Sequence, residues 1–282
     1  MTLILPGNVA SALGGGYEVA NSCRFNDDDS PHLTKSTGST SNRKTFSLSF
    51  WIKKCKNKAS GSQNIWSSNN NSTIFTTLYF ENDNLRYYDY IEGVVNHWTT
   101  NRKFRDTNAW MHILFVHDST ESSASDRVKL FINGTQETSM STSSYPILNA
   151  DAFVNVSGYN VNFGAQGLSD SAADRLDGYL AEIVFVDGTA LTPTSFGEFD
   201  EDSPTIFKPK DVSGLSLGTN GYYLDFEDSS NLGNDVNGGT DFTETNIAAT
   251  DQATDTPTNN FCTFNPLDVT ADDEATLSEG NV

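Results

Sequence analysis

Three short runs of this chain alternate apolar and polar side chains with a period of two, and each run ends in a turn. They lie at residues 108–118 (NAWMHILFVHD), 127–135 (RVKLFINGT) and 176–191 (LDGYLAEIVFVDGTAL). Successive side chains of a β-strand point to opposite faces of the sheet, so this period predicts strands. The fold is therefore built around strands.

The turn residues support this interpretation. Asn133-Gly134 and Asp187-Gly188 both tolerate positive φ and favour tight hairpin turns. In the last run, strict alternation places one set of side chains on one face: Tyr179, Ala181, Ile183 and Phe185. It places the other set on the opposite face: Leu180, Glu182, Val184 and Val186.

Further strands are expected along most of the chain. Residues 46–54 (FSLSFWIKK) carry Phe46, Leu48, Phe50 and Ile52 on one face, and a strand pair is expected near 74–80 and 85–91. Turns recur about every 8–15 residues, as in an antiparallel sandwich. No linker interrupts this pattern, so we expect one all-β domain at 17–245, with an extended N-terminal arm at 1–16 and an acidic C-terminal docking tail at 246–282.

Charge is distributed unevenly around a formal net charge of −20. Beyond Lys210 there is no Lys or Arg, while residues 211–282 contain fourteen Asp or Glu; residues 35–105 contain eleven Lys or Arg against four acids. The acidic excess argues against nucleic acid as a partner. The tail is either solvated or docked on the basic segment of its own or a neighbouring chain.

Cysteine use and hydropathy indicate the compartment. The three cysteines, Cys23, Cys55 and Cys262, are widely spaced and form no CxxC, which predicts neither a zinc site nor a disulfide framework and favours a reducing cytoplasm. The first apolar run stops at Pro6 and lacks a basic flank, unlike a signal peptide. No apolar stretch approaches the roughly 18 residues of a membrane helix, so no membrane insertion is expected.

The three alternating runs, in their order, resemble a laminin-G-like domain of the concanavalin A-like lectin/glucanase superfamily. The resemblance implies a jelly-roll β-sandwich and narrows the function to binding, assembly or polysaccharide chemistry. Residues 16–36, 178–200, 218–235 and 247–267 also resemble segments of virion proteins of marine bacteriophages. That resemblance implies a particle component, such as a head decoration, a head fibre or a tail-associated subunit, assembled in the host cytoplasm.

One segment is out of the family's order. In laminin-G-like domains, a strand such as YYLDFED followed by an Asp/Asn/Gly-rich turn usually opens the domain, whereas here it follows the other strands, at 222–228. Residues 218–245 therefore either close the sandwich of their own chain or insert into a neighbouring subunit. Closure within the chain is the simpler alternative.

Catalytic patterns are weak. Glycosidases of this fold carry Glu-x-Asp-x-x-Glu on a strand, but the nearest run, Glu198-Phe-Asp200, has Ser203 at the sixth position and lies in a loop. Retaining and inverting glycosidases both use a pair of carboxyl groups, and this run does not provide that pair. His112 and His117 are five residues apart on one strand, so they face opposite ways and cannot bind one metal. We expect no enzymatic activity.

Hard oxygen ligands on a glycine-rich turn make calcium the best metal candidate. The set is Asp225, Asp228, Asp235, Asn237 and Asp241, and several laminin-G-like relatives bind calcium at loop rims. The spacing differs from an EF-hand, and Asp and Asn are also the usual residues of tight turns. No other cofactor is indicated.

Sugar recognition requires exposed aromatic rings. Those expected in or beside loops are Trp66, Trp98, Tyr88 and Tyr90, together with Tyr87. The sequence thus favours a structural or interaction protein of a bacteriophage particle, which contacts copies of itself and other virion proteins through its terminal arms. The alternative is a lectin domain that binds a host surface glycan, and a polysaccharide depolymerase is least favoured.

Overall fold

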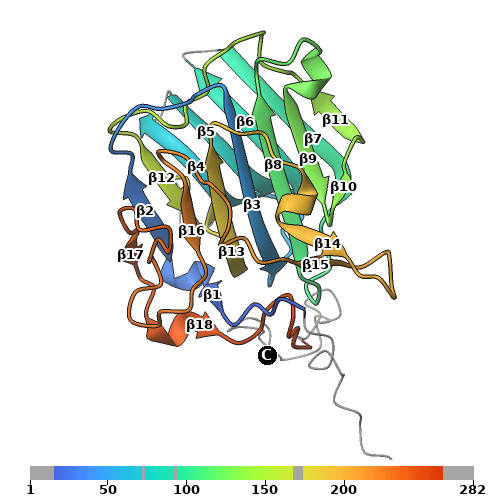
Figure 1. Ribbon diagram of the computed structural model, residues 1–282, viewed down its shortest axis with the longest axis vertical. Coiled ribbons are helices and arrows are strands. Elements are labelled where there is room, and N and C mark those ends of the chain that lie inside the picture. The colour runs from blue at the N-terminus through green and yellow to red at the C-terminus, as the bar shows by residue number, and fades with distance from the viewer. Residues whose placement is uncertain (1–15, 72–73, 92–93, 168–173, 263–282) are drawn as a thin grey trace, which may run out of the picture.

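The computed structural model describes residues 16–71, 74–91, 94–167 and 174–262. Two large antiparallel sheets stack face to face, and the sheet that contains β3, β8 and β9 lies in front of the sheet that contains β4 to β7 in Figure 1. The all-β jelly-roll sandwich predicted from the sequence is confirmed. In the described part of the chain, no helix has the length and apolar character needed to cross a membrane.

The first sheet, here called sheet A, has the order β10-β9-β8-β3-β13-β1-β18, with β16 also pairing β13. Its strands are β1 (Ser22–Phe25), β3 (Thr45–Lys54), β8 (Met111–Asp118), β9 (Val128–Ile132), β10 (Thr135–Gln136), β13 (Gly178–Asp187), β16 (Tyr222–Leu224) and β18 (Gln252–Ala253).

The second sheet, sheet B, has the order β11-β7-β6-β5-β4-β12-β2-β17. Its strands are β2 (His32–Ser36), β4 (Ser62–Asn71), β5 (Ile74–Glu81), β6 (Asn84–Ile91), β7 (Val94–Lys103), β11 (Met140–Ser143), β12 (Asn160–Phe163) and β17 (Thr243–Thr245). A separate hairpin joins β14 (Gly197–Phe199) to β15 (Phe207–Pro209).

One of the two predicted hairpin turns is present. Asn133 and Gly134 have φ of 48° and 75° and connect β9 to β10, as expected for a turn that needs two left-handed residues. The prediction for Asp187-Gly188 is wrong. The chain leaves β13 there and crosses the sheet, so no strand folds straight back onto β13.

Aromatic rings from both inner faces form the core. Phe46, Phe115 and Phe185 of sheet A meet Trp66 and Tyr87 of sheet B, with the ring centroids of Tyr87 and Phe115 4.9 Å apart. Centroids of Phe46 and Trp66 are 6.5 Å apart. Tilted contacts at these distances suit the ring quadrupoles and add to the burial of apolar area. The core therefore fixes how the two sheets face one another.

A bulge in β13 corrects the predicted alternation. Glu182 has φ of 50° and is the extra residue where the register with β3 shifts between Ala181 and Val184. As a result Leu180, Ile183 and Phe185 all point into the core, and Ala181 does not share their face. The bulge also marks the point where the second neighbour of β13 changes from β1 to β16.

The outer face of sheet A is apolar and is covered by chain segments from far along the sequence. Trp51, Trp110 and Tyr179 pack with Val19 and with Phe207 of β15. Leu114, Val116, Val184 and Val186 pack under a second group: Phe196, Val212 and Leu217. Figure 1 shows this crossing segment in front of β3 and β8. Residues 191–217 therefore act as a third layer.

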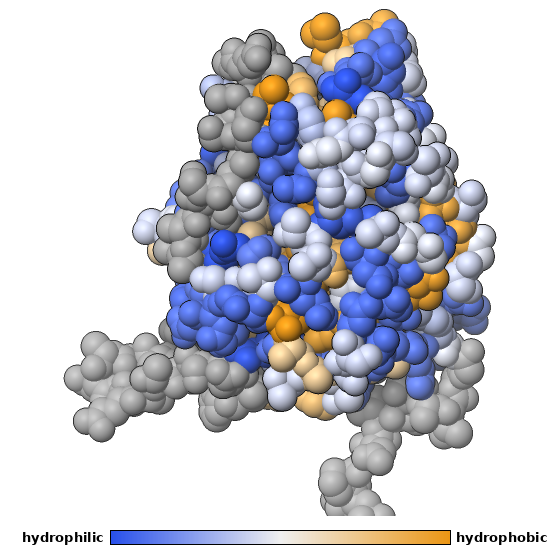
Figure 2. All heavy atoms as spheres, turned by 90° about the vertical axis from the view of Figure 1, so that its left-hand side faces the viewer, coloured by the Kyte–Doolittle hydropathy of each residue, from blue (hydrophilic) through white to orange (hydrophobic). Residues whose placement is uncertain are grey.

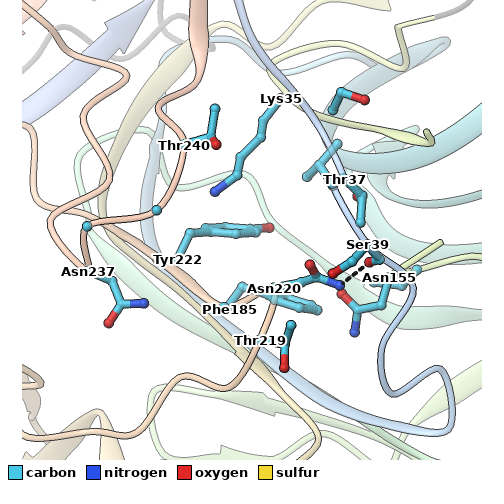
Figure 3. A pocket seen from close by; sticks show the side chains of 17 residues that line it. Lys35, Thr37, Ser39, Asn155, Phe185, Thr219, Asn220, Tyr222, Asn237 and Thr240 are labelled. Atoms are coloured by element: carbon cyan, nitrogen blue, oxygen red, sulfur yellow. Dashed lines mark hydrogen bonds between the residues drawn. The ribbon is translucent and has the colours of Figure 1, made fainter. Parts of the chain in front are cut away.

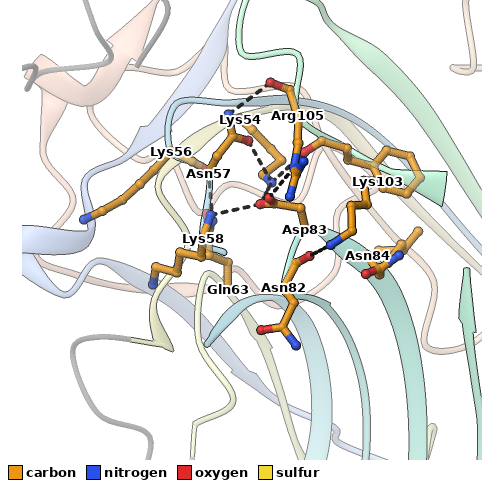
Figure 4. Close-up of polar contacts among 12 residues, drawn as sticks. Lys54, Lys56, Asn57, Lys58, Gln63, Asn82, Asp83, Asn84, Lys103 and Arg105 are labelled. Carbon is orange, nitrogen blue, oxygen red and sulfur yellow. Dashed lines mark hydrogen bonds and ion pairs between the residues drawn. The ribbon is translucent and has the colours of Figure 1, made fainter. Parts of the chain in front are cut away.

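Most cations of the basic segment, residues 35–105, form ion pairs within the chain. Asp83, at the β5–β6 turn, is 2% exposed and accepts hydrogen bonds from Lys54 Nζ (3.1 Å), Arg105 Nε (3.0 Å) and the backbone N–H of Lys58 (2.9 Å), as Figure 4 shows. Lys56 Nζ lies 2.8 Å from Asp27 Oδ2. These ion pairs involve acids from the first third of the chain.

The C-terminal segments lie on the sandwich of their own chain. Strand β16 pairs with β13, β17 with β2, and β18 with β1. Beyond residue 245 the chain continues to pack: Asp255 Oδ2 lies 2.7 Å from Lys53 Nζ, and Trp110 donates a hydrogen bond from Nε1 to Asp255 Oδ1 at 2.8 Å. Lys53 also donates to the carbonyl oxygen of Phe261 at 2.6 Å. The acidic tail thus contacts the basic segment through Asp255, and residues 263–282 lie outside the described residues.

We expect the substitution Asp255→Asn to destabilise the protein by about 3–5 kcal/mol, because it leaves the ammonium of Lys53, which is 0% exposed, without a counter-charge. Urea denaturation measures the free energy of unfolding. The control is Asp202→Asn, an exposed carboxylate with no ion pair among the described residues, for which we expect a change within about 0.5 kcal/mol. If the two variants were equally stable, the ion pair of Asp255 with buried Lys53 would not be needed for stability.

Glu182 gives a pH-dependent prediction. Its side chain accepts hydrogen bonds from the hydroxyls of Tyr17 (3.0 Å) and Tyr223 (2.8 Å), and burial raises its pKa from 4.5 to about 7. Between pH 4.5 and about pH 7, Glu182 is protonated in the folded protein and ionised in the unfolded chain. The contribution to stability is therefore full below about pH 4.5 and lost as the pH rises to about 7.

The substitution Glu182→Gln removes this titration, so the free energy of unfolding of the variant, relative to wild type, should rise by up to about 3 kcal/mol between about pH 5 and about pH 8. Burial also raises the pKa of Asp89 and of Asp177 to about 6, and comparison with wild type cancels their contribution. The exposed Glu201→Gln is the control and should show no such rise, because Glu201 is not among the charges that shift the pKa of Glu182. If the difference in the free energy of unfolding between Glu182→Gln and wild type did not change with pH, the raised pKa assigned to Glu182 would be wrong.

Candidate functional site

The outer face of β5, β6 and β7 carries a group of aromatic side chains that we call the aromatic face. Leu78 and Phe80 of β5 point into the core, so alternation turns Phe75 and Tyr79 outward. In β6, Leu85 and Tyr87 point inward in the same way. The aromatic face consists of Phe75, Tyr79, Tyr88 and Tyr90, together with Arg86 and His97, all of them partly exposed.

Three rings of the aromatic face are close to parallel. The centroids of Tyr88 and Tyr90 are 6.1 Å apart with an interplanar angle of 13°, and those of Phe75 and Tyr88 are 5.8 Å apart at 23°. Phe75 and Tyr90 are 5.5 Å apart at 30°. Cross-strand register sets this arrangement, since Phe75 pairs with Tyr90 and Thr77 with Tyr88.

Arg86 ties the tyrosines together. Its guanidinium carbon lies 5.1 Å from the ring centroid of Tyr88 and 5.9 Å from that of Tyr79, both within cation–π range, and Nη1 pairs with Glu81. Burial raises the pKa of Tyr79 well above its usual range, so its hydroxyl stays a hydrogen-bond donor at any physiological pH. The rings are therefore held in place before any ligand arrives.

A small cleft of about 160 Å³ adjoins the aromatic face. It is lined by Ser62, Asn64, Phe75, Thr77, Tyr79, Tyr88, Gln166 and Asp174. Hydroxyl, amide and carboxylate groups thus lie beside flat apolar rings. Such a combination suits a ligand that has both apolar surface and many hydroxyls.

The structure separates the predicted sugar-binding residues into two groups. Tyr88 and Tyr90 lie together on the aromatic face, as described above. The prediction for Trp66 and Trp98 is wrong: they are 0% and 2% exposed, in the core, and so is Tyr87. Their strands turn these rings inward, so they have no face to offer a sugar. Phe75, Tyr79, Arg86 and His97 were missed, although the period of two could have identified them once one inner residue was known.

The predicted calcium ligands do not converge. Among the described residues, no three His, Cys, Asp or Glu side chains lie close enough to hold a metal ion. Asp235 Oδ2 pairs instead with Lys35 Nζ at 3.0 Å, and Asp241 Oδ1 accepts the backbone N–H of Asp235 at 3.0 Å. Asp225 and Asp228 cap turns by accepting the backbone N–H groups of Glu227 and Ser230.

Asn237 lies on the exposed loop that follows, and its backbone N–H donates to Asp235 Oδ1 at 3.2 Å. These five residues therefore shape a loop, which was the competing interpretation of the same residue types.

The remaining candidates are structural. His117 stacks on Phe46 in the core, while His112 lies on the outer face with Nε2 2.8 Å from the hydroxyl of Ser49, so the prediction of opposite faces is confirmed. Burial lowers the pKa of His112 to about 3. Phe196 and Phe207 contact its ring, which is fully buried, so this Ser–His pair cannot meet a substrate. The acidic run at Glu198 and Asp200 forms ion pairs with Lys208 beside an exposed turn.

Comparison with known proteins places the fold. A model of the laminin-G-like family, described as "Concanavalin A-like lectin/glucanases superfamily", matches residues 27–195, which is more than half of the chain. No curated protein matches the sequence.

One solved structure with a TM-score above 0.5 agrees in fold, and two others are similar at lower scores. A putative carbohydrate binding protein from Bacteroides ovatus has a TM-score of 0.52 and 14% identity, with 82% of this chain and 60% of that one covered. The heptameric SAP-like pentraxin from Limulus polyphemus has a TM-score of 0.45 and 14% identity, covering 63% and 80%. Domains LG4-5 of the mouse laminin alpha1 chain give 0.43 and 11%, covering 62% and 46%. At such identities the likeness shows the fold alone. The family match establishes that the chain belongs to the concanavalin A-like lectin/glucanase superfamily, as a laminin-G-like domain.

Proposed function

We propose that the protein is a non-enzymatic interaction protein of a bacteriophage particle and that its aromatic face binds glycan. One observation carries the glycan-binding part: Phe75, Tyr88 and Tyr90 present nearly parallel, partly exposed rings on a strand surface. A pyranose ring has a C–H face that packs on an aromatic ring and a periphery of hydroxyls. Such a ligand therefore needs rings and hydrogen-bonding groups side by side.

The polar groups around the rings complete the argument. Arg86 supplies N–H donors beside Tyr88, and Asn64 and Gln166 line the adjoining cleft. The rings of Phe75, Tyr88 and His97 lie on three adjacent strands, on the outer face of the sheet and not within a closed pocket. This shape suits an internal stretch of a glycan chain. A putative carbohydrate binding protein among the structural relatives is consistent with this proposal.

The proposal excludes hydrolysis of the bound glycan. Asp174 is the one carboxylate among the described residues that line the cleft. Retaining and inverting glycosidases usually need two carboxyl groups about 5–9.5 Å apart across the scissile bond. Binding without cleavage is measured as glycan retention with no release of reducing ends.

The phage setting is supported by the resemblance of residues 16–36, 178–200, 218–235 and 247–267 to segments of virion proteins. In this setting the partners are other virion proteins and further copies of the chain. Assembly through the terminal arms is best examined by deleting residues 263–282, because the segment 246–262 packs on the sandwich itself. Particles that incorporate the shortened chain as well as wild type would contradict docking by these residues.

Glycan binding is tested with an array of bacterial surface glycans. We expect Tyr88→Ala and Tyr90→Ala each to weaken the binding of any captured glycan about tenfold or more, since each removes one stacking ring. The matched control is Tyr159→Ala, a partly exposed tyrosine away from the aromatic face, which should bind as wild type does. Binding should persist in a chelator, because the predicted calcium ligands do not converge.

Two results would overturn the proposal. One is an array on which wild-type protein captures no glycan. The other is capture that survives both tyrosine substitutions unchanged, which would place the glycan elsewhere on the molecule.

A further inference from the structure

Lys53 of β3 is a buried lysine whose amine lies beside a side-chain amide. Its side chain is 0% exposed, and Nζ lies 2.7 Å from Asp255 Oδ2 and 2.6 Å from the carbonyl oxygen of Phe261. A third hydrogen bond, of 2.8 Å, joins Nζ to Asn260 Oδ1, 207 residues later in the chain. An amine and a carboxamide are the two groups from which a new amide bond can form with release of ammonia.

Aromatic side chains surround this amine. Trp51 lies on the same face of β3 as Lys53, and Tyr179 is the cross-strand partner of Lys53 on β13. Trp110 of the same cluster donates from Nε1 to Asp255 Oδ1 at 2.8 Å, which fixes the carboxylate. Burial makes an ion pair costly, and transfer of one proton from Nζ to Asp255 converts the pair into two neutral groups. The neutral amine is the form that acts as a nucleophile.

The carboxamide of Asn260 is held at both ends. Its Nδ2 donates to the carbonyl oxygen of Asn108 at 2.8 Å, while its Oδ1 accepts from Lys53. The side chain therefore cannot turn its carbonyl group away from the amine without breaking both hydrogen bonds. Two reacting groups that are held in contact react much faster than the same groups free in solution. Asn260 is exposed, so the released ammonia has a path to solvent.

Lys35 has a buried carboxylate partner but lacks the amide. Its Nζ lies 3.0 Å from Asp235 Oδ2 and 5.4 Å from the ring centroid of Tyr222, whose ring lies beside it in Figure 3. Within the described part of the chain, no carboxamide oxygen accepts a hydrogen bond from this nitrogen. The side of the molecule that carries β2 and β17 is also mainly hydrophilic (Figure 2). Lys35 therefore forms an ordinary ion pair.

Lys54 is a closer comparison. Its side chain is also 0% exposed, with Nζ 3.1 Å from Asp83 Oδ1 and 3.4 Å from Asn57 Oδ1 (Figure 4). Asp83, however, is also paired with the guanidinium of Arg105 at 3.0 Å. A proton moved from Lys54 to Asp83 would leave that guanidinium without a counter-charge, and the amide is farther from the amine. We therefore expect Lys54 to keep its ion pair and to serve as an internal control.

We propose that Lys53 and Asn260 join through an isopeptide bond within the folded chain. A bond forms between Nζ of Lys53 and Cγ of Asn260, and the Cγ–Nδ2 bond breaks. One of the three ammonium protons stays on the new amide, and two pass by way of Asp255 to the leaving nitrogen, which departs as an ammonium ion. Asp255 returns to its carboxylate form, and no oxidant or reductant is required. The bond fixes the segment 246–262 covalently to β3, independently of any glycan binding.

The intact mass of the full chain tests the proposal. Wild-type protein that has been folded and incubated until its mass is constant should be lighter, by one ammonia, than the same chain kept in denaturant since its synthesis. Only the fold brings together two residues that are 207 positions apart, so the unfolded chain should keep its full mass. A tryptic digest of the folded protein should contain a branched peptide that joins Lys53 to Asn260, because trypsin does not cut after an acylated lysine.

Two variants separate this bond from other losses of ammonia. Asn260→Ala keeps the pair of Lys53 with Asp255 and should show no loss of mass. The matched control is Asn57→Ala, which removes the amide beside Lys54 and should become lighter as wild type does. The proposal is overturned if folded wild type keeps its full mass, or if Asn260→Ala still loses ammonia. It is also overturned if the loss maps to cyclisation at an Asn-Gly pair and no branched peptide is found.

Discussion

Every strand of a stacked pair of sheets has one face in the core and one face outside it, and the outer faces of this protein are treated differently. Sheet A carries Trp51, Trp110 and Tyr179 on its outer face, too much apolar area to leave in water. Residues 191–217 and the C-terminal segment around Asp255 cover it. On sheet B the outer face keeps partly exposed rings over β5 to β7. The surface proposed to bind glycan is therefore the outer face that no other segment of the described chain is seen to bury.

Ion pairs connect segments that are distant in the sequence. Three cations of residues 35–105 each pair with a buried carboxylate: Lys54 with Asp83, Lys35 with Asp235 and Lys53 with Asp255. A buried ion pair contributes little net stability compared with an apolar pair, but breaking one is costly. We infer that these pairs mainly select the position of each segment. Two of the three acids come from the acidic C-terminal third, which accounts for part of the uneven charge along the sequence.

The aromatic face is made by three consecutive strands, β5 to β7, so its rings are neighbours through hairpin register. The polar groups of the adjoining cleft come from farther along the chain: Asn64 lies on β4, and Gln166 follows β12. Pairing of β4 with β5 and with β12 brings these groups to the rings.

The sequence alone determined what depends on local periodicity. The all-β sandwich, the shared face of Phe46, Leu48, Phe50 and Ile52, the Asn133-Gly134 hairpin and the opposite faces of His112 and His117 follow from a period of two and from the φ that each residue tolerates. Tyr88 and Tyr90 were identified by residue type, without the four neighbours that complete the aromatic face.

Only the tertiary structure decided which face of each strand lies inward. It put Trp66 and Trp98 in the core, inserted Glu182 as a bulge that reverses the alternation of β13, and used Asp235 to hold Lys35 in place of a metal. The physical reason is that periodicity relates side chains within one strand, whereas burial, bulges and ion pairs depend on partners that are distant in the sequence.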